Sequence, residues 1–156
     1  MAVPSFNPMP KRDRKYWMIM AALIAALFWI VSLSVDVQIY DFRDAAYDSR
    51  TKGLILLIFG WLFGPLGLTV AWYANLPLLV CIGLMLFGRV PSFLTASVSL
   101  VLALTALFPM YFWDPRWGGG LSFVRGPAIW LWLASFVTVW LAVALLAWPN
   151  SRTEGR

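Results

Sequence analysis

Three aspartates in one polar stretch are the strongest candidates for chemistry in this sequence. Asp41, Asp44 and Asp48 lie within residues 36–52, the longest polar stretch after the N-terminal tail. If residues 41–48 are helical, the three carboxylates are spaced i, i+3 and i+7 and share one face. Clustered carboxylates can bind a divalent cation. The aspartates are therefore candidate cation ligands.

A catalytic role for these aspartates has little further support. Phosphotransferases that act on CDP-alcohols use an aspartate array of this general kind, but here Ala45 and Ala46 follow Asp44 where that array needs Gly, and no second pair of aspartates follows. The preferred interpretation is a solvated loop in which the acids alternate with Arg43 and Arg50. A lipid-modifying enzyme that uses these carboxylates is kept as the third functional hypothesis.

Other reactive groups are scarce. The sequence has no His, the commonest metal ligand and general base, and its single Cys81 lies inside an apolar run. It contains no nucleotide-binding loop, Cys pair, nucleophile elbow or zinc-protease motif. We therefore predict no catalytic residue, no cofactor and no bound metal, and we do not expect an enzyme.

The composition predicts an integral membrane protein. Of 156 residues, 62% are hydrophobic and 12% are charged, with a mean hydropathy of +0.78. An average soluble domain has about 45–50% apolar and about 25% charged residues. We therefore expect neither an aqueous monomer nor a disordered chain. The net charge of +5 is interpreted as a topology signal, and no nucleic-acid partner is expected.

The apolar runs predict an all-α bundle of four transmembrane helices. The uncharged run Tyr16–Val35 would extend about 30 Å, the thickness of a hydrocarbon core. The expected segments are a cytoplasmic basic tail at 1–15, one transmembrane domain at 16–148 with spans at about 16–35, 66–88, 93–113 and 127–148, an outer loop at 36–52, and a polar tail at 149–156.

The uncharged segment 53–88 is too long for one crossing, because a helix of 36 residues would extend about 54 Å. Either 53–72 and 76–88 are separate spans, which gives five crossings, or 66–88 is one crossing and 53–64 forms a short interfacial or re-entrant helix. The sequence Gly64-Pro65 favours a break within 53–67. The second interpretation, with four crossings, is preferred.

The distribution of basic residues also favours four crossings. With four, seven bases lie on the cytoplasmic side and five outside, whereas five crossings give six on each side. Cytoplasmic loops carry the excess of Lys and Arg. We therefore expect both termini in the cytoplasm and a multi-pass protein of the bacterial inner membrane.

Five positions are candidate functional or helix-packing residues: Asn75, Pro77, Gly60, Gly64 and Gly67. The predicted spans hold no Asp, Glu, Lys or Arg, which disfavours proton relays and ion-coupled transport. Asn75 lies two residues before Pro77, so its amide could cap a helix or face a cavity, and capping is preferred. Gly60 and Gly64 form a GxxxG pair, for which we expect contact within the chain rather than self-association.

Two short motifs carry a resemblance. The run Ala71–Pro77 and the run Leu131–Ser135 resemble a group of small bacterial membrane proteins to which no activity is assigned, over residues 53–148 in outline. In that group Pro follows Asn directly, whereas here Leu76 intervenes. The resemblance implies an inner-membrane location and transfers no functional residue.

The leading functional hypothesis is a non-enzymatic membrane protein, an accessory subunit or envelope factor that acts by interaction. Its expected partners are the lipid bilayer and either another membrane protein or further copies of this chain. The second hypothesis is a small oligomeric transporter or channel, with Asn75 and the Gly60–Gly67 break lining the path.

Overall fold

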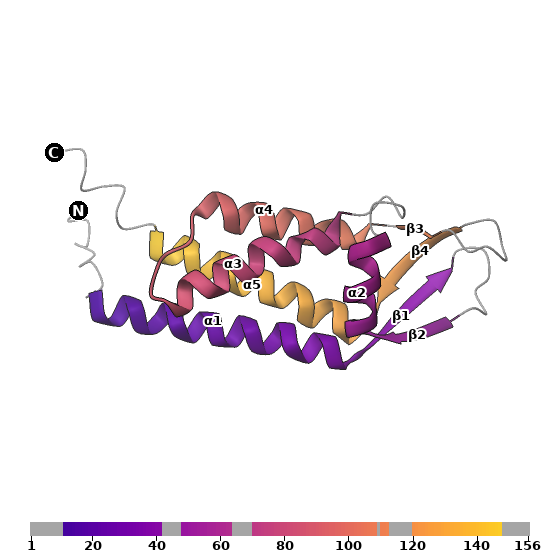
Figure 1. The fold of residues 1–156 in the computed structure, drawn as a ribbon, viewed down its shortest axis with the longest axis horizontal. Helices are drawn as coiled ribbons and strands as arrows, with labels where there is room; N and C mark the ends of the chain where they lie inside the picture. The colour runs from indigo at the N-terminus through magenta and orange to yellow at the C-terminus, as the bar shows by residue number, and fades with distance from the viewer. Residues whose placement is uncertain (1–10, 42–47, 64–69, 109, 113–119, 148–156) are drawn as a thin grey trace, which may run out of the picture.

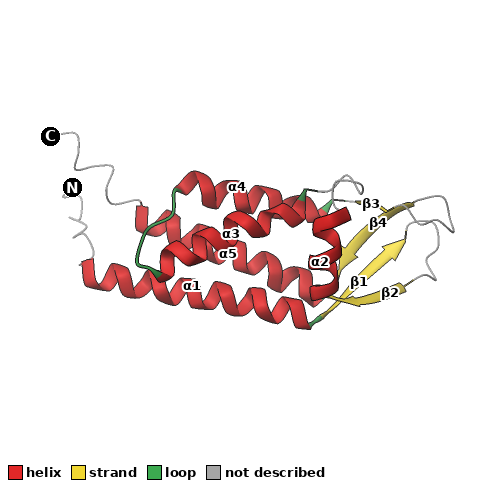
Figure 2. Cartoon of the chain, in the orientation of Figure 1, coloured by secondary structure: helices red, strands yellow, loops and turns green. Residues whose placement is uncertain are grey.

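Four helices run along the long axis of the molecule, and a small sheet closes one end of them (Figures 1 and 2). The computed structural model describes residues 11–41, 48–63, 70–108, 110–112 and 120–147. The four helices are α1 (Lys11–Ser34), α3 (Asn75–Leu86), α4 (Phe93–Leu104) and α5 (Pro127–Ala147). Short 3₁₀ turns extend two of them: η1 (Ala71–Ala74) leads into α3, and η2 (Thr105–Leu107) continues α4.

Successive long helices run in opposite directions, so α1 begins where α5 ends (Figure 1). Arg14 near the start of α1 donates a hydrogen bond from Nη2 to the carbonyl oxygen of Leu146 at 2.7 Å. A base at this place satisfies one of the carbonyls that a helix leaves unpaired at its C-terminus. This hydrogen bond joins the start of α1 to the end of α5.

Local sequence explains where two helices begin. Ser92 has extended backbone angles, and its hydroxyl accepts a hydrogen bond from the Thr95 amide at 3.0 Å, so it caps α4. Helix α5 begins at Pro127, whose missing N–H is not needed in a first turn. Gly126 before it has φ +105°, a conformation that other residues rarely adopt.

The short helix expected within 53–64 is present as α2 (Gly53–Phe63). It lies across the end of the bundle, between the long helices and the sheet (Figure 1), and it contacts η1 and the neighbouring strand. Described helical structure resumes only at Ala71. The second predicted span, 66–88, is therefore a shorter helix than expected, and residues 64–69 lie outside the described part.

The all-α prediction is wrong at the end of the bundle. Four strands form an antiparallel sheet in the order β2-β1-β4-β3: β1 (Asp36–Asp41), β2 (Asp48–Lys52), β3 (Met110–Phe112) and β4 (Gly120–Arg125). The predicted outer loop 36–52 thus forms a strand pair, and the predicted span 93–113 ends as a strand.

The sheet was missed for a physical reason. Strand β2 is polar throughout, with the sequence DSRTK, and so has the composition of a solvated loop. In β1, however, Val37 and Ile39 alternate with the polar Gln38, which is the period-two pattern of a strand. Strand β1 pairs with β2 and also with β4, and the distant β4 supplies backbone hydrogen bonds that no local pattern reveals.

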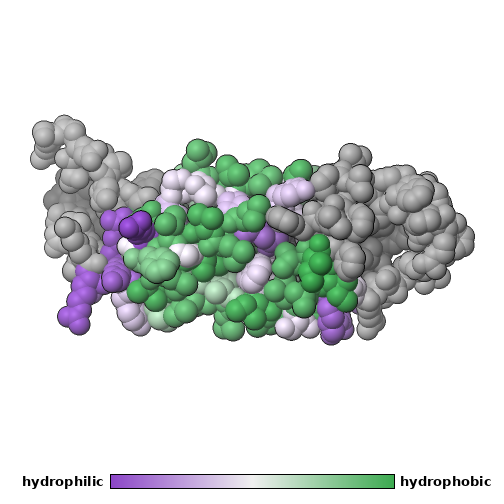
Figure 3. Space-filling model, viewed as in Figure 1, coloured by the Kyte–Doolittle hydropathy of each residue, from purple (hydrophilic) through white to green (hydrophobic). Residues whose placement is uncertain are grey.

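The bundle has an apolar exterior. Large apolar side chains point outward from all four long helices: Leu23, Leu27 and Ile30 of α1, Leu79 and Val80 of α3, Leu94, Val98 and Val101 of α4, and Leu141 and Leu145 of α5. On the face drawn in Figure 3, apolar residues cover most of the middle of the molecule, and hydrophilic residues lie towards both ends of the described part. The interior contains many small or polar residues, including Ala22, Ala25, Ala96, Ser99, Ala103 and Ser135.

Within the residues that the structure describes, two helices are long and apolar enough to cross a membrane, α1 over Arg12–Ser34 and α5 over Pro127–Leu146. Two further apolar helical segments are shorter, Ala71–Leu86 and Phe93–Leu107. The predominantly helical structure is thus confirmed, and α1 and α5 are candidate spans by length and composition.

Candidate functional site

The described interior contains a polar group that joins three helical elements. The side-chain oxygen of Asn75 accepts two indole N–H hydrogen bonds, from Trp29 in α1 and Trp132 in α5, both at 2.9 Å. Its amide nitrogen donates to the carbonyl oxygen of Trp72 in η1 at 2.8 Å. Asn75 is only 4% exposed, so these bonds form where water cannot compete with them.

The side chain of Asn75 does not cap the N-terminus of α3, because Asn75 is the first residue of that helix and Ala74 occupies the cap position without a side-chain hydrogen bond. Asn75 is instead the C-cap residue of η1, and its amide nitrogen bonds the Trp72 carbonyl of that turn. Its side-chain oxygen bridges two helices that are distant in the sequence. Pro77 is the third residue of α3, within the first turn, where proline is tolerated because the backbone N–H has no helical partner there.

A fourth helix joins the same group. The Ser99 hydroxyl in α4 donates to the carbonyl oxygen of Ala74 at 3.0 Å. The ring of Trp132 contacts that of Phe136 edge-to-face, with centroids 4.7 Å apart. We call the residues Trp29, Trp72, Asn75, Ser99 and Trp132 the tryptophan–asparagine cluster. Its hydrogen bonds join α1, α3, α4 and α5, so it holds these helices in register.

Gly60 packs against this cluster. A Cβ atom added at Gly60 would lie 2.5 Å from the Trp72 ring, so only glycine lets α2 approach the indole this closely. This contact within the chain agrees with the interpretation of the Gly60–Gly64 pair as an intramolecular one. Gly64 and Gly67 lie outside the described residues.

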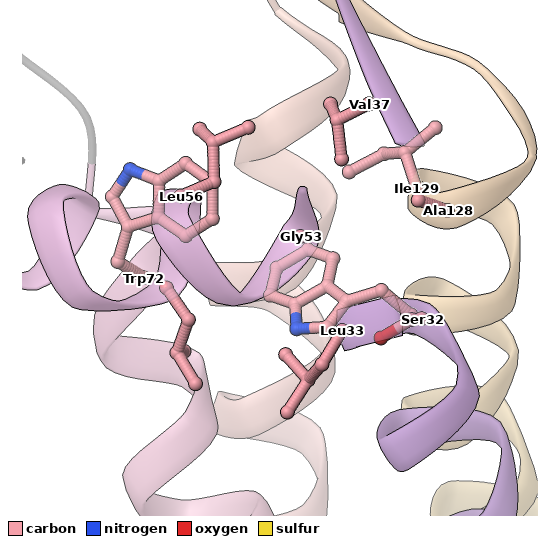
Figure 4. A pocket seen from close by; sticks show the side chains of 10 residues that line it. Ser32, Leu33, Val37, Gly53, Leu56, Trp72, Ala128 and Ile129 are labelled. Atoms are coloured by element: carbon pink, nitrogen blue, oxygen red, sulfur yellow. The ribbon is translucent and has the colours of Figure 1, made fainter. Parts of the chain in front are cut away.

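A small apolar pocket lies beside the cluster, at the junction of α1, α2, β1 and α5 (Figure 4). Its walls include Leu33, Val37, Leu56, Ile129 and Trp132, and its free space is about 30 Å³. Sites for small molecules usually have several hundred Å³. The pocket is a packing gap between the bundle and the sheet, and we assign it no ligand.

The two described aspartates lie in strands, so the helical condition under which the three carboxylates would share a face is not met at either end of 41–48. Asp41 ends β1 and Asp48 begins β2, and Asp48 pairs in register with Tyr40. Asp44 lies outside the described residues. Within the described part of the chain, no group of three or more His, Cys, Asp or Glu side chains could hold a metal ion.

Sequence reasoning singled out Asn75 but not the residues that bind it. Trp29 and Trp132 lie 46 and 57 residues away along the chain, and an indole in an apolar run carries no sign of its partner. One signal was available in the sequence: each of these tryptophans falls inside an apolar helix rather than at its end. An indole N–H in the interior of such a helix needs a buried acceptor. No family model matches this chain, and neither a curated protein nor a solved structure matches it.

Proposed function

We propose that this chain is a non-enzymatic, multi-pass protein of the bacterial inner membrane that acts by binding another membrane protein. The observation that carries the membrane part is the outward-facing apolar side chains on all four long helices, around an interior rich in small residues and hydrogen bonds. Soluble proteins rarely expose apolar surface on every helix. Small residues and hydrogen bonds between helices are typical of packing in lipid.

Helix α2 supports four crossings although two helices are short. At 1.5 Å per residue, Ala71–Leu86 and Phe93–Leu107 extend about 24 and 22 Å, less than the roughly 30 Å of a hydrocarbon core. Helix α2 lies across this end of the bundle (Figure 1) and has exposed Leu54, Ile55 and Ile58. An apolar helix in this position adds apolar surface at the membrane interface, at the end of the bundle that faces the sheet.

The arrangement of charges supports an orientation. The start of α1, with Arg12, Arg14 and Lys15, and the turn with Arg89 lie at the end opposite the sheet. Cytoplasmic loops are enriched in bases, so we assign this end to the cytoplasm and the sheet to the outer side. Even numbers of crossings bring both termini to one side, in agreement with the contact between Arg14 and Leu146.

An interaction role is favoured over catalysis and transport. The described interior is filled by side chains such as Leu78, Met85 and Phe136, each less than 2% exposed, which leaves no path through the bundle in the part that the structure describes. The sheet offers a binding surface, because β2 and β3 each pair on one side only among the described strands. Exposed strand edges commonly bind extended segments of other proteins.

One pair of variants tests the proposed membrane location. Val101 is 62% exposed in the middle of the α4 region, and Phe87 is 82% exposed at its end of the bundle. In a bilayer, Val101→Lys places a charge at mid-depth and costs about 2.5–3.5 kcal/mol, whereas Phe87→Lys lies at headgroup level and changes little. In a soluble protein both would be neutral surface changes. We expect only Val101→Lys to lower the amount of protein resistant to carbonate extraction, and equal behaviour would contradict the proposal.

Topology and partner binding need separate experiments. A phosphatase reporter active outside the cytoplasm should be silent after residue 156 and active in the 42–47 segment, and activity at residue 156 would contradict four crossings. Chemical crosslinking in native membranes followed by purification should recover a second membrane protein. Recovery of the chain alone, together with solute flux through liposomes that contain it, would instead support an oligomeric channel.

A further inference from the structure

We infer that the end of the bundle opposite the sheet binds the headgroups of anionic phospholipids through Arg12, Lys15 and Arg89. This inference rests on the proposed membrane location. Arg12 and Lys15 belong to the first turns of α1, and Arg89 belongs to the turn between α3 and α4. All three side chains are exposed, and within the described residues no ion pair neutralises them.

Packing brings the two basic segments together. A Cβ atom added at Gly88 would lie 3.1 Å from Cε of Lys15, so the Lys15 stem lies against Gly88 and its ammonium group reaches the turn that carries Arg89. Gly88 has φ +72°, which other residues rarely adopt. Asp13 is the acid in this turn of α1 and is also exposed. The bases outnumber it, and the local charge is positive.

Aromatic residues set the depth of this basic surface. Tyr16 and Trp17 are more than half exposed, with ring centroids 5.8 Å apart in an edge-to-face contact. Phe87, next to Gly88, is also highly exposed. Exposed aromatic rings of this kind lie at the boundary between hydrocarbon and headgroups. The neighbouring bases then lie at the level of the lipid phosphates.

The two ends of the bundle differ in how their charges are used. At the sheet end, Lys52 pairs with Asp36 at 2.6 Å, so its charge is compensated within the chain. At the opposite end Arg14 is occupied by the Leu146 carbonyl, and Arg12, Lys15 and Arg89 are left for an external anion. A phospholipid fits better than a soluble anion, because the three bases border the apolar exterior of the bundle. The bases can bind the phosphate while the acyl chains lie against that exterior.

Native mass spectrometry of the full chain, purified in mixed micelles of phosphatidylglycerol and phosphatidylcholine, tests this inference. We expect the wild type to retain phosphatidylglycerol preferentially. A base near an anionic surface contributes about a five-fold factor in binding, so Lys15→Gln and Arg89→Gln should each lower the preference about five-fold and their combination more than tenfold. Lys52→Gln, which removes one charge at the sheet end, is the matched control and should leave the preference unchanged.

Three results would overturn the inference. Equal retention of the two lipids by the wild type would exclude selective binding, and an equal loss in Lys52→Gln would show a general effect of net charge. Displacement of phosphatidylglycerol by millimolar inorganic phosphate would indicate a site for free phosphate instead. Because carbonate extraction and reporter fusions test the membrane location separately, failure here with intact membrane insertion would remove only the lipid site.

Discussion

The tryptophan–asparagine cluster makes a quantitative prediction about stability. Asn75→Leu keeps the number and branching of the side-chain heavy atoms, so it removes three hydrogen bonds without opening a cavity. The lost bonds join Asn75 to Trp29, Trp132 and the backbone of Trp72 at 2.8–2.9 Å. Side-chain hydrogen bonds in helical membrane proteins contribute about 0.6 kcal/mol on average and about 1.7 kcal/mol at most. The predicted loss of unfolding free energy is therefore about 2–5 kcal/mol.

The assay is reversible unfolding in mixed micelles with increasing SDS, followed by far-ultraviolet circular dichroism. Ser97→Ala is the control, because it removes a single hydrogen bond, from the Trp140 indole at 3.1 Å in a partly buried position. We expect it to cost about 0.6 kcal/mol or less. A loss in Asn75→Leu no larger than in Ser97→Ala would refute the assignment of the cluster as the polar centre of the bundle.

A double-mutant cycle separates the hydrogen bond from the packing of the ring. Trp29→Phe keeps an aromatic ring but removes the N–H that Asn75 accepts. Its cost in the wild type should exceed its cost in the Asn75→Leu background by about 0.6–1.7 kcal/mol, because in that background the acceptor is already absent and only the loss of ring packing remains. An identical cost in both backgrounds would mean that the indole ring, and not its N–H, carries the contribution.

Two further changes test individual contacts by the same unfolding assay. Gly60→Ala should destabilise the protein by about 1–3 kcal/mol, because the new methyl group would overlap the Trp72 ring. Gly83→Ala is the control, because a Cβ atom there meets nothing within 4 Å. This change should raise the free energy of unfolding by up to about 1 kcal/mol through helix propensity. An equal effect of the two changes would contradict the close packing of Gly60. Arg14→Gln should lower the free energy of unfolding by about 1–2 kcal/mol, because it removes the hydrogen bond to the Leu146 carbonyl. A change below about 0.3 kcal/mol would show that this bond does not stabilise the packing of α5 against α1.

Local sequence was sufficient for much of the helical framework. The uncharged runs predicted α5 and the end of α1 nearly to the residue, whereas α1 begins at Lys11, inside the expected tail 1–15. The Gly64-Pro65 break predicted a separate short helix, observed as α2 (Gly53–Phe63). Hydropathy and helix breakers act within a few residues, so they can be read without knowing the fold. Helix length was less well predicted, because an apolar run such as 93–113 can change from helix to strand without a change in hydropathy.

The site was predicted only in part. Asn75 stood out as an amide in an apolar segment, and its burial with three hydrogen bonds agrees with a packing role. The polar segment that holds Asp41 and Asp48 was interpreted as a solvated loop, whereas pairing with β4 stabilises a strand at β1. A polar stretch of this length has no strong preference of its own, so tertiary contacts decide its conformation.

The sequence by itself determined the apolar character of the helices and the confinement of charge to the first turns of α1 and the segments outside the helices, because both are sums over neighbouring residues. Tertiary structure alone decided that β1 pairs with β4 and that Trp29 and Trp132 meet at Asn75. Each of these contacts joins residues far apart in the chain, and their free energy exists only after the bundle has brought them together.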